Sequence, residues 1–203
     1  MSETIRAVIF DVGGVLVRTF DQGGRRVWED RLGLLPGEAE AIVLNSEMGH
    51  RAQRGEITTA ELWAWAGQRL RLEGDNLETF RTDFWRGDGV DPTLHDLIRR
   101  LHRDYQTAII SNATDALLES LGVYGLLEDF DLVVCSADEG ITKPAAAIYE
   151  IALARLGRAA DECVFIDDAP ANVAAAQALG MHAILFTPAL DLEAALATLG
   201  VRT

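Results

Sequence analysis

Short apolar runs alternate with segments of helical periodicity through most of the chain. Helical patterns follow the last four of these runs, and alternation of this kind is typical of a parallel sheet. The continuous apolar character of the strands indicates that helices cover both faces of the sheet. We therefore predict an α/β fold, a Rossmann-like three-layer α/β/α arrangement whose parallel sheet has five strands or slightly more. The predicted strands are Ile5–Phe10, Thr107–Ile110, Asp131–Cys135, Glu162–Ile166 and Ala183–Phe186.

Residues 18–89 differ from their flanks. They show no strand pattern, and their apolar residues recur at helical spacing, as Leu62, Ala66 and Leu70 do. We predict that 18–89 form a small helical bundle inserted into a core domain made of residues 1–17 and 90–203. All four tryptophans lie in this region: Trp28, Trp63, Trp65 and Trp85.

Polar residues stand where the predicted strands end. Because the carboxyl ends of parallel strands lie along one edge of a sheet, where ligands bind, we expect these side chains to meet in one crevice. They are Asp11 after the first strand, Ser111 and Asn112 after the second, Lys143 beyond the third, and Asp167 and Asp168 after the fourth.

Three carboxylates would share this crevice with one lysine. Like charges about 4 Å apart repel by roughly 4 kcal/mol at an effective dielectric near 20, so either some carboxylates are protonated or a cation lies among them. Oxygen ligands in a partly open site suit Mg²⁺, whose octahedron water and a substrate phosphate can complete. Lys143 is the only lysine of the chain and stands at a predicted helix start, where its charge and free backbone N–H groups would favour phosphate.

Each of these residues also has a structural interpretation. Asp11 can close a turn, Ser111 can cap a helix, and Asp167 and Asp168 can cap the helix that follows them. Lys143 can be an ordinary surface lysine. The coincidence of all of them at successive strand ends favours a functional site over four separate structural roles.

Composition and charge exclude several classes of protein. Hydrophobic residues make up 49% of the 203 and charged residues 25%, as in a folded soluble domain, and the net charge of −14 disfavours nucleic acid as a partner. No apolar run is long enough to span a membrane, and the first is interrupted by Asp11, which makes a poor signal peptide. We expect a cytoplasmic monomer or weak homodimer without membrane contacts. Cys135 and Cys163 lie in apolar runs and are expected to be buried thiols.

Taken together, these motifs resemble the haloacid dehalogenase superfamily of phosphatases over nearly the whole chain. FDVGGVLV is similar to its first motif, ISNAT to its second, Lys143 to its third and IDDAPAN to its fourth. The insertion at 18–89 resembles the helical cap of that superfamily. Within it, RGEITTAEL resembles a group that contains bacterial sugar-phosphate phosphatases and the N-terminal phosphatase domain of soluble epoxide hydrolase.

The resemblance implies Mg²⁺-dependent hydrolysis of small-molecule phosphomonoesters through an aspartyl-phosphate. Sugar phosphates are a candidate class of substrate. The resemblance also implies that Asp11 is the nucleophile, that Ser111 and Asn112 bind the phosphoryl group, and that Lys143 and Mg²⁺ offset the charge of the transition state. The implied metal ligands are Asp11, the Gly13 carbonyl and Asp168, with Asp167 beside the metal, where it orients a bound water. Asn172 is implied to steady the acidic loop, and Gly14 to lie next to the substrate.

One position departs from the pattern. Many phosphatases of the superfamily carry an acid/base aspartate two residues after the nucleophile, where this chain has Gly13. Asp21 and His50 are candidates to replace it, by residue type and region alone. Two alternative functions stay open: a metal-independent 2-haloacid dehalogenase, and a non-catalytic or weakly active binding or regulatory protein on the same fold.

Two features of the cap have competing interpretations. Trp63 and Trp65 could line a substrate face, although packing of the small bundle is the more common use of such aromatics. Gly23 and Gly24 could form a hinge or a plain flexible loop. The order of strands in the superfamily implies that Cys135 and Cys163 lie on strands that are not adjacent, so we expect no disulfide.

Overall fold

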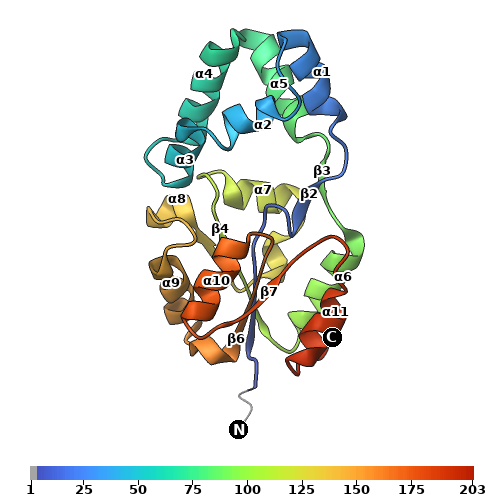
Figure 1. The fold of residues 1–203 in the computed structure, drawn as a ribbon, viewed down its shortest axis with the longest axis vertical. Helices are drawn as coiled ribbons and strands as arrows, with labels where there is room; N and C mark the ends of the chain where they lie inside the picture. Colours follow the sequence, from blue (N-terminus) through green and yellow to red (C-terminus); the bar gives the residue numbers. More distant parts are fainter. Residues whose placement is uncertain (1–3) are drawn as a thin grey trace.

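The structure is a computed structural model that describes residues 4–203, so the first three residues of the predicted core lie outside it. Its centre is a five-stranded sheet in the order β5-β4-β1-β6-β7, in which every neighbouring pair is parallel (Figure 1). This confirms the predicted fold class. The strands are β1 (Ala7–Phe10), β4 (Gln106–Ser111), β5 (Leu132–Cys135), β6 (Cys163–Asp167) and β7 (His182–Leu185).

Helices cover both faces of the sheet because successive strand side chains point to opposite sides. Val8 and Phe10 of β1 join one apolar cluster, while Ala7 and Ile9 join the other. The first face is packed by α6 (Pro92–Leu101), α7 (Leu117–Val123) and α11 (Leu192–Thr198), and the second by α9 (Ala146–Leu156) and α10 (Pro170–Ala178). The remaining short elements of the core are η1 (Leu127–Asp129), α8 (Ser136–Glu139) and η2 (Ala160–Glu162).

The two cysteines lie on strands separated by β4 and β1. Cys135 ends β5 and Cys163 begins β6, and both are buried free thiols, which confirms the expectation that they do not bond. Among residues 4–203, no helix is both long and apolar enough to cross a lipid bilayer.

Five helices between residues 23 and 85 form a helical insertion with its own apolar cluster, which lies at one end of the molecule in Figure 1. Thr58 and Glu61 form a capping box at the start of α4, as Thr followed three residues later by Glu favours. The helices are α1 (Gly23–Leu32), α2 (Glu38–Val43), α3 (Glu47–Gln53), α4 (Thr59–Leu70) and α5 (Gly74–Trp85).

Trp63 lies inside this cluster, which corrects its interpretation as a substrate contact. It is 4% exposed, and its ring meets Phe80 and Phe84 edge to face at centroid distances of 5.9 and 5.7 Å. Trp65 is half-buried against the same cluster. Burial of large aromatic area is what a bundle of short helices needs for its stability, and it leaves Trp63 no access to a ligand.

The segments that connect the insertion to the core correct a second expectation. Residues 18–89 were predicted to lack strands, but β2 (Val17–Thr19) and β3 (Asp88–Val90) pair antiparallel at the two crossings. Three-residue strands are too short to show an alternating pattern in sequence. Their pairing is reinforced by a side-chain bond, since the Thr19 hydroxyl donates to Asp88 Oδ1 at 2.7 Å.

Gly23 and Gly24 do not form a flexible loop, which corrects that interpretation. Both residues begin helix α1, and a Cβ on Gly24 would lie 2.2 Å from the Asp83 carbonyl oxygen of α5. The glycine therefore permits α1 and α5 to pack backbone against backbone.

Candidate functional site

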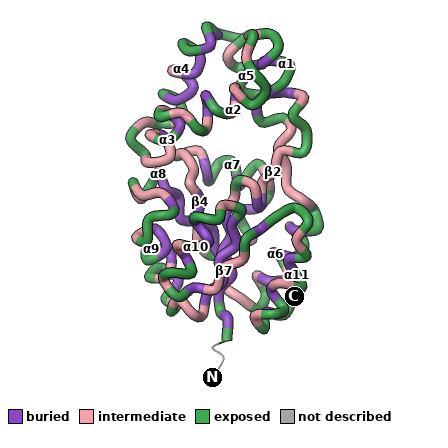
Figure 2. The backbone as a smooth tube through the Cα atoms, in the orientation of Figure 1, coloured by how far each residue is buried: buried purple, intermediate pink, exposed green. Residues whose placement is uncertain are grey.

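The strand ends bring the predicted polar residues to one edge of the sheet. β1 lies between β4 and β6, so Asp11 at the end of β1 is flanked by Ser111, the last residue of β4, and Asp167, the last residue of β6. All three are buried, and Figure 2 shows the buried core continuing up to this edge beneath the helical insertion. The topology thus joins residues that are more than 150 positions apart.

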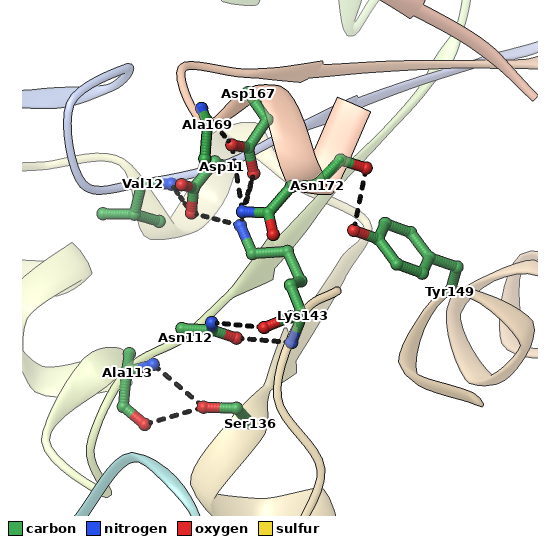
Figure 3. Close-up of polar contacts among 10 residues, drawn as sticks. All are labelled: Asp11, Val12, Asn112, Ala113, Ser136, Lys143, Tyr149, Asp167, Ala169 and Asn172. Atoms are coloured by element: carbon green, nitrogen blue, oxygen red, sulfur yellow. Dashed lines mark hydrogen bonds and ion pairs between the residues drawn. The ribbon is translucent and has the colours of Figure 1, made fainter. Parts of the chain in front are cut away.

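Lys143 lies between two of the carboxylates. Its Nζ is 2.8 Å from Asp11 Oδ1 and 2.7 Å from Asp167 Oδ2, and its side chain is 1% exposed (Figure 3). A buried ammonium group needs such partners, because an unpaired charge in the interior is very costly. The alternative that Lys143 is a surface lysine is therefore wrong.

Asn112 holds the backbone of the lysine. Its Nδ2 donates to the Lys143 carbonyl oxygen at 3.0 Å, and its Oδ1 accepts from the Lys143 N–H at 2.7 Å. The two bonds fasten the segment before α9 to the end of β4. That helix begins at Ala146, later than the start predicted beside Lys143, because Ala145 still lies in a turn and its N–H donates to the carbonyl of Thr142.

Asp167 is enclosed by donors. Asn172 Nδ2 lies 3.1 Å from each of its oxygens, and the Ala169 N–H donates to Oδ1 at 2.8 Å. Asn172 is fixed in turn by Tyr149, whose hydroxyl donates to the Asn172 carbonyl at 3.1 Å (Figure 3). With Lys143 on Oδ2, Asp167 has little capacity left for another ligand.

Asp168 is the exposed member of the acidic group. Oxygens of Asp11, Asp167 and Asp168 all lie within 4.8 Å of one another. Burial raises the pKa of Asp11 to about 6, although Lys143 opposes this, and burial together with the charge of Asp167 raises the pKa of Asp168. One lysine thus does not balance the charge of three carboxylates. A group of oxygen donors that is open on one side and carries excess negative charge fits Mg²⁺.

Two consecutive glycines shape the turn after Asp11. Gly14 has a φ of +77°, and a Cβ on it would lie 2.1 Å from Asp168 Oδ2. Gly13 is exposed, and a Cβ there would meet nothing within 4 Å. Gly14 therefore makes room for Asp168, whereas Gly13 is free of steric demand from the rest of the chain.

Other candidate residues are not tied to this group. Within residues 4–203, the Ser111 hydroxyl makes no hydrogen bond, which leaves it available to a ligand. Asp21 uses Oδ1 to accept from the Gly23 N–H at 2.8 Å, and His50 is exposed on α3. Neither makes a hydrogen bond or ion pair with the acidic group in the described part of the chain.

Sequence reasoning missed Ser136. It directly follows β5, is fully buried, and its Oγ accepts from the Ala113 N–H at 3.0 Å. The rule that selected Asp11 and Ser111, a polar residue at the end of a parallel strand, would have selected Ser136 had it been applied to the third strand as well.

Comparison with known proteins gives a consistent family. Residues 5–180 match the family model for haloacid dehalogenase-like hydrolases. The chain is 31% identical over 195 residues to the sesquiterpene phosphatase astK of Aspergillus oryzae, covering 94% of each protein. It is 28% identical over 191 residues to the fructose-1-phosphate phosphatase YqaB of Escherichia coli, covering 91% of this chain and 97% of that one.

A solved structure shares the fold. The HAD family enzyme bt-2542 of Bacteroides thetaiotaomicron, in complex with magnesium and inorganic phosphate, superposes with a TM-score of 0.78 at 21% identity. The match covers 94% of this chain and 98% of that one.

Proposed function

This chain belongs to the haloacid dehalogenase-like hydrolase family and is a phosphoric monoester hydrolase, and we propose that it depends on Mg²⁺ and uses Asp11 as its nucleophile. The observation that carries the proposal is the placement of Lys143 Nζ within 2.8 Å of Asp11 Oδ1, in a group that also contains Asp168. A cation held beside the nucleophile offsets the charge that spreads over a transferring phosphoryl group.

Phosphoryl transfer would proceed in two displacements. A carboxylate oxygen of Asp11 attacks phosphorus, the bond from phosphorus to the ester oxygen breaks, and the alcohol leaves after taking a proton from water. Water then attacks the phosphorus of the aspartyl-phosphate, which releases inorganic phosphate and restores the carboxylate. Within residues 4–203, the Asp11 carboxylate is bonded by the Val12 N–H and by Lys143 Nζ, both at Oδ1, which supports Oδ2 as the attacking atom.

The residues around Asp11 divide the remaining roles. Asp11, Asp168 and the Gly13 carbonyl would hold Mg²⁺, which supplies positive charge opposite the phosphoryl oxygens when bound. Asp167, occupied by Lys143 and Asn172, holds the lysine in place and stands behind the ligand set. Ser111 would donate its free hydroxyl to a phosphoryl oxygen.

We propose a small phosphorylated metabolite as the substrate and the helical insertion as its cap. The named substrates of the two relatives, a sesquiterpene derivative and fructose 1-phosphate, differ in polarity, so the family does not fix the class. Sugar phosphates are the first class to test, followed by terpenoid phosphates. A panel of both, assayed for phosphate release with Mg²⁺, ranks them by kcat/KM.

The decisive test compares two isosteric variants with p-nitrophenyl phosphate in Mg²⁺. Asp11→Asn should lose turnover by roughly a thousandfold or more, whereas Asp104→Asn, the same change in an exposed aspartate outside the site, should stay close to wild type. Undiminished activity of Asp11→Asn would refute the mechanism.

The wild type also tests the two alternative functions. Phosphate binding without turnover would favour a binding protein. Chloride release from a 2-haloacid in EDTA would favour a dehalogenase, although Asp168 should repel the carboxylate of such a substrate.

A further inference from the structure

The loop between α3 and α4 touches the core on the side away from β2 and β3 (Figure 1). We call residues 53–59 the contact segment. At its end, the Thr59 N–H donates to Asp115 Oδ1 at 2.9 Å, and the Thr59 hydroxyl bonds to Thr114 Oγ1 at 2.7 Å and to Asp115. Thr114 and Asp115 follow β4, only a few residues beyond Ser111. The contact segment therefore lies directly on the loop that leaves the candidate site.

The middle of the contact segment lies against backbone. Gly55 has a φ of +67°, and a Cβ on it would be 2.1 Å from the carbonyl oxygen of Ala137 in α8. Only glycine fits both the conformation and the distance. The insertion and the core are thus seated against each other at this point without an intervening side chain.

Ser136 lies between the two parts. Its Oγ accepts from the Ala113 N–H at 3.0 Å and has two possible acceptors for its own proton: the Gln53 carbonyl of the insertion at 2.6 Å and the Ala113 carbonyl of the core at 3.1 Å. A hydroxyl has one proton to donate. The shorter distance indicates that the proton goes to Gln53 when the insertion is seated.

The second acceptor makes this bond exchangeable. If the insertion lifts, the hydroxyl can turn to the Ala113 carbonyl, so the buried donor does not lose its partner. An unsatisfied buried donor would cost about 1–3 kcal/mol, and this cost is avoided in both states. The two states differ in the core, because the Ala113 carbonyl receives the Ser136 proton only when the insertion has lifted. The same oxygen goes on accepting from the Ala113 N–H in either case.

Ala113 connects this exchange to the candidate site. It follows Asn112, whose amide holds both the N–H and the carbonyl of Lys143, and Lys143 reaches Asp11. We propose that Ser136 is a positioning residue of the phosphatase. Its hydroxyl donates to the Gln53 carbonyl when the insertion is seated and to the Ala113 carbonyl when it is not, and this exchange couples seating of the insertion to the loop that holds Lys143. The proposal rests on the function proposed above.

The test compares Ser136→Ala with Ser120→Ala in the full chain. Ser120→Ala removes the same group, but the Ser120 hydroxyl donates to the carbonyl oxygen of Ala116, the residue just before α7. For Ser136→Ala we expect kcat/KM per folded molecule to fall about tenfold, mostly in kcat, and Ser120→Ala to stay within about twofold of wild type. A purely structural role would lower the melting temperature and leave kcat per folded molecule unchanged, which would overturn the proposal.

Hydrogen exchange provides a second readout that needs no activity. In Ser136→Ala, the amide of Thr59 should exchange at least about tenfold faster, although it makes no bond to Ser136, because the contact segment is seated less of the time. Unchanged protection of Thr59 would also overturn the proposal. If the wild type hydrolyses no phosphate ester, the proposed function fails, while the exchange measurement still decides whether Ser136 couples the two parts.

A second pair of variants covers the case in which Ser136→Ala does not fold. Thr59→Val removes the hydroxyl bonds of the contact segment to Thr114 and Asp115, and Thr82→Val removes a hydroxyl that only bonds the Glu78 carbonyl on α5. If seating of the insertion controls turnover, kcat should fall severalfold in Thr59→Val and stay unchanged in Thr82→Val. Equal activity of the two variants would count against the coupling.

Discussion

The carboxylate of Asp168 occupies the space that a side chain on Gly14 would need. A Cβ on Gly14 would lie 2.1 Å from Asp168 Oδ2, and the φ of +77° there is unfavourable for any other residue. The turn after β1 and the loop after β6 therefore approach each other closely at the place where we propose the metal. Asp168 can take this position only because Gly14 has no Cβ.

Gly14→Ala should displace Asp168 and reduce Mg²⁺-dependent turnover by roughly a hundredfold, since misplacement by about 1 Å can have that effect. Gly122→Ala is the matched control, because Gly122 lies on α7, outside the acidic group, and a Cβ there would meet nothing within 4 Å. Steady-state kinetics on both variants, with Mg²⁺ affinity from calorimetry, checks the prediction. Similar losses in the two variants would contradict it.

Gly13→Asp should improve turnover of substrates with poor leaving groups. The position is exposed and sterically open, and a carboxyl two residues after Asp11 could protonate the departing alcohol. General acid catalysis contributes about 10²–10⁴-fold where the leaving group needs a proton. We expect a gain for alkyl phosphates and little change for p-nitrophenyl phosphate, whose leaving group needs none. An equal gain for both substrates would point to another cause.

Asp11→Asn should stabilise the metal-free protein in a pH-dependent way. Burial raises the pKa of Asp11 to about 6, while an unfolded aspartate ionises near pH 4. Between these values the folded chain keeps a proton that the unfolded chain has lost, so stability falls as the pH rises through this window. Calorimetry in EDTA should show the variant melting roughly 5 °C above wild type at pH 7.5 and no difference near pH 4. A gap that does not change with pH would exclude this explanation.

Lys143→Met should abolish most activity and also destabilise the fold. It leaves Asp11 and Asp167 buried without their cation, and breaking a buried pair in this way costs about 3–5 kcal/mol. Urea unfolding should show a smaller loss at pH 5 than at pH 8, because Asp11, whose pKa burial raises to about 6, takes up a proton at the lower pH and so relieves part of the charge. Arg99→Met is the control, since the Arg99 side chain is 55% exposed and its contact with Asp129 is 3.6 Å long, and the change should cost less than about 1 kcal/mol.

The sequence by itself determined the order of the elements and the residues that end the parallel strands. Short apolar β-branched runs that alternate with helical patterns favour strands buried between helices, and the geometry of a parallel sheet brings their carboxyl ends to one edge. Asp11, Ser111, Asp167 and Lys143 could be selected on that basis, because neither argument requires knowledge of side-chain contacts.

Only the tertiary structure decided how these residues share their partners. Burial of Trp63, pairing of β2 with β3, and the division of the acidic pair into an enclosed Asp167 and an exposed Asp168 depend on neighbours that are distant in the chain. The same holds for Ser136, whose hydroxyl meets Gln53 across the contact between insertion and core. A periodic pattern reports which face of an element is buried, but hydrogen bonds and steric limits depend on positions of atoms within a few ångströms, and these are set only when the elements pack.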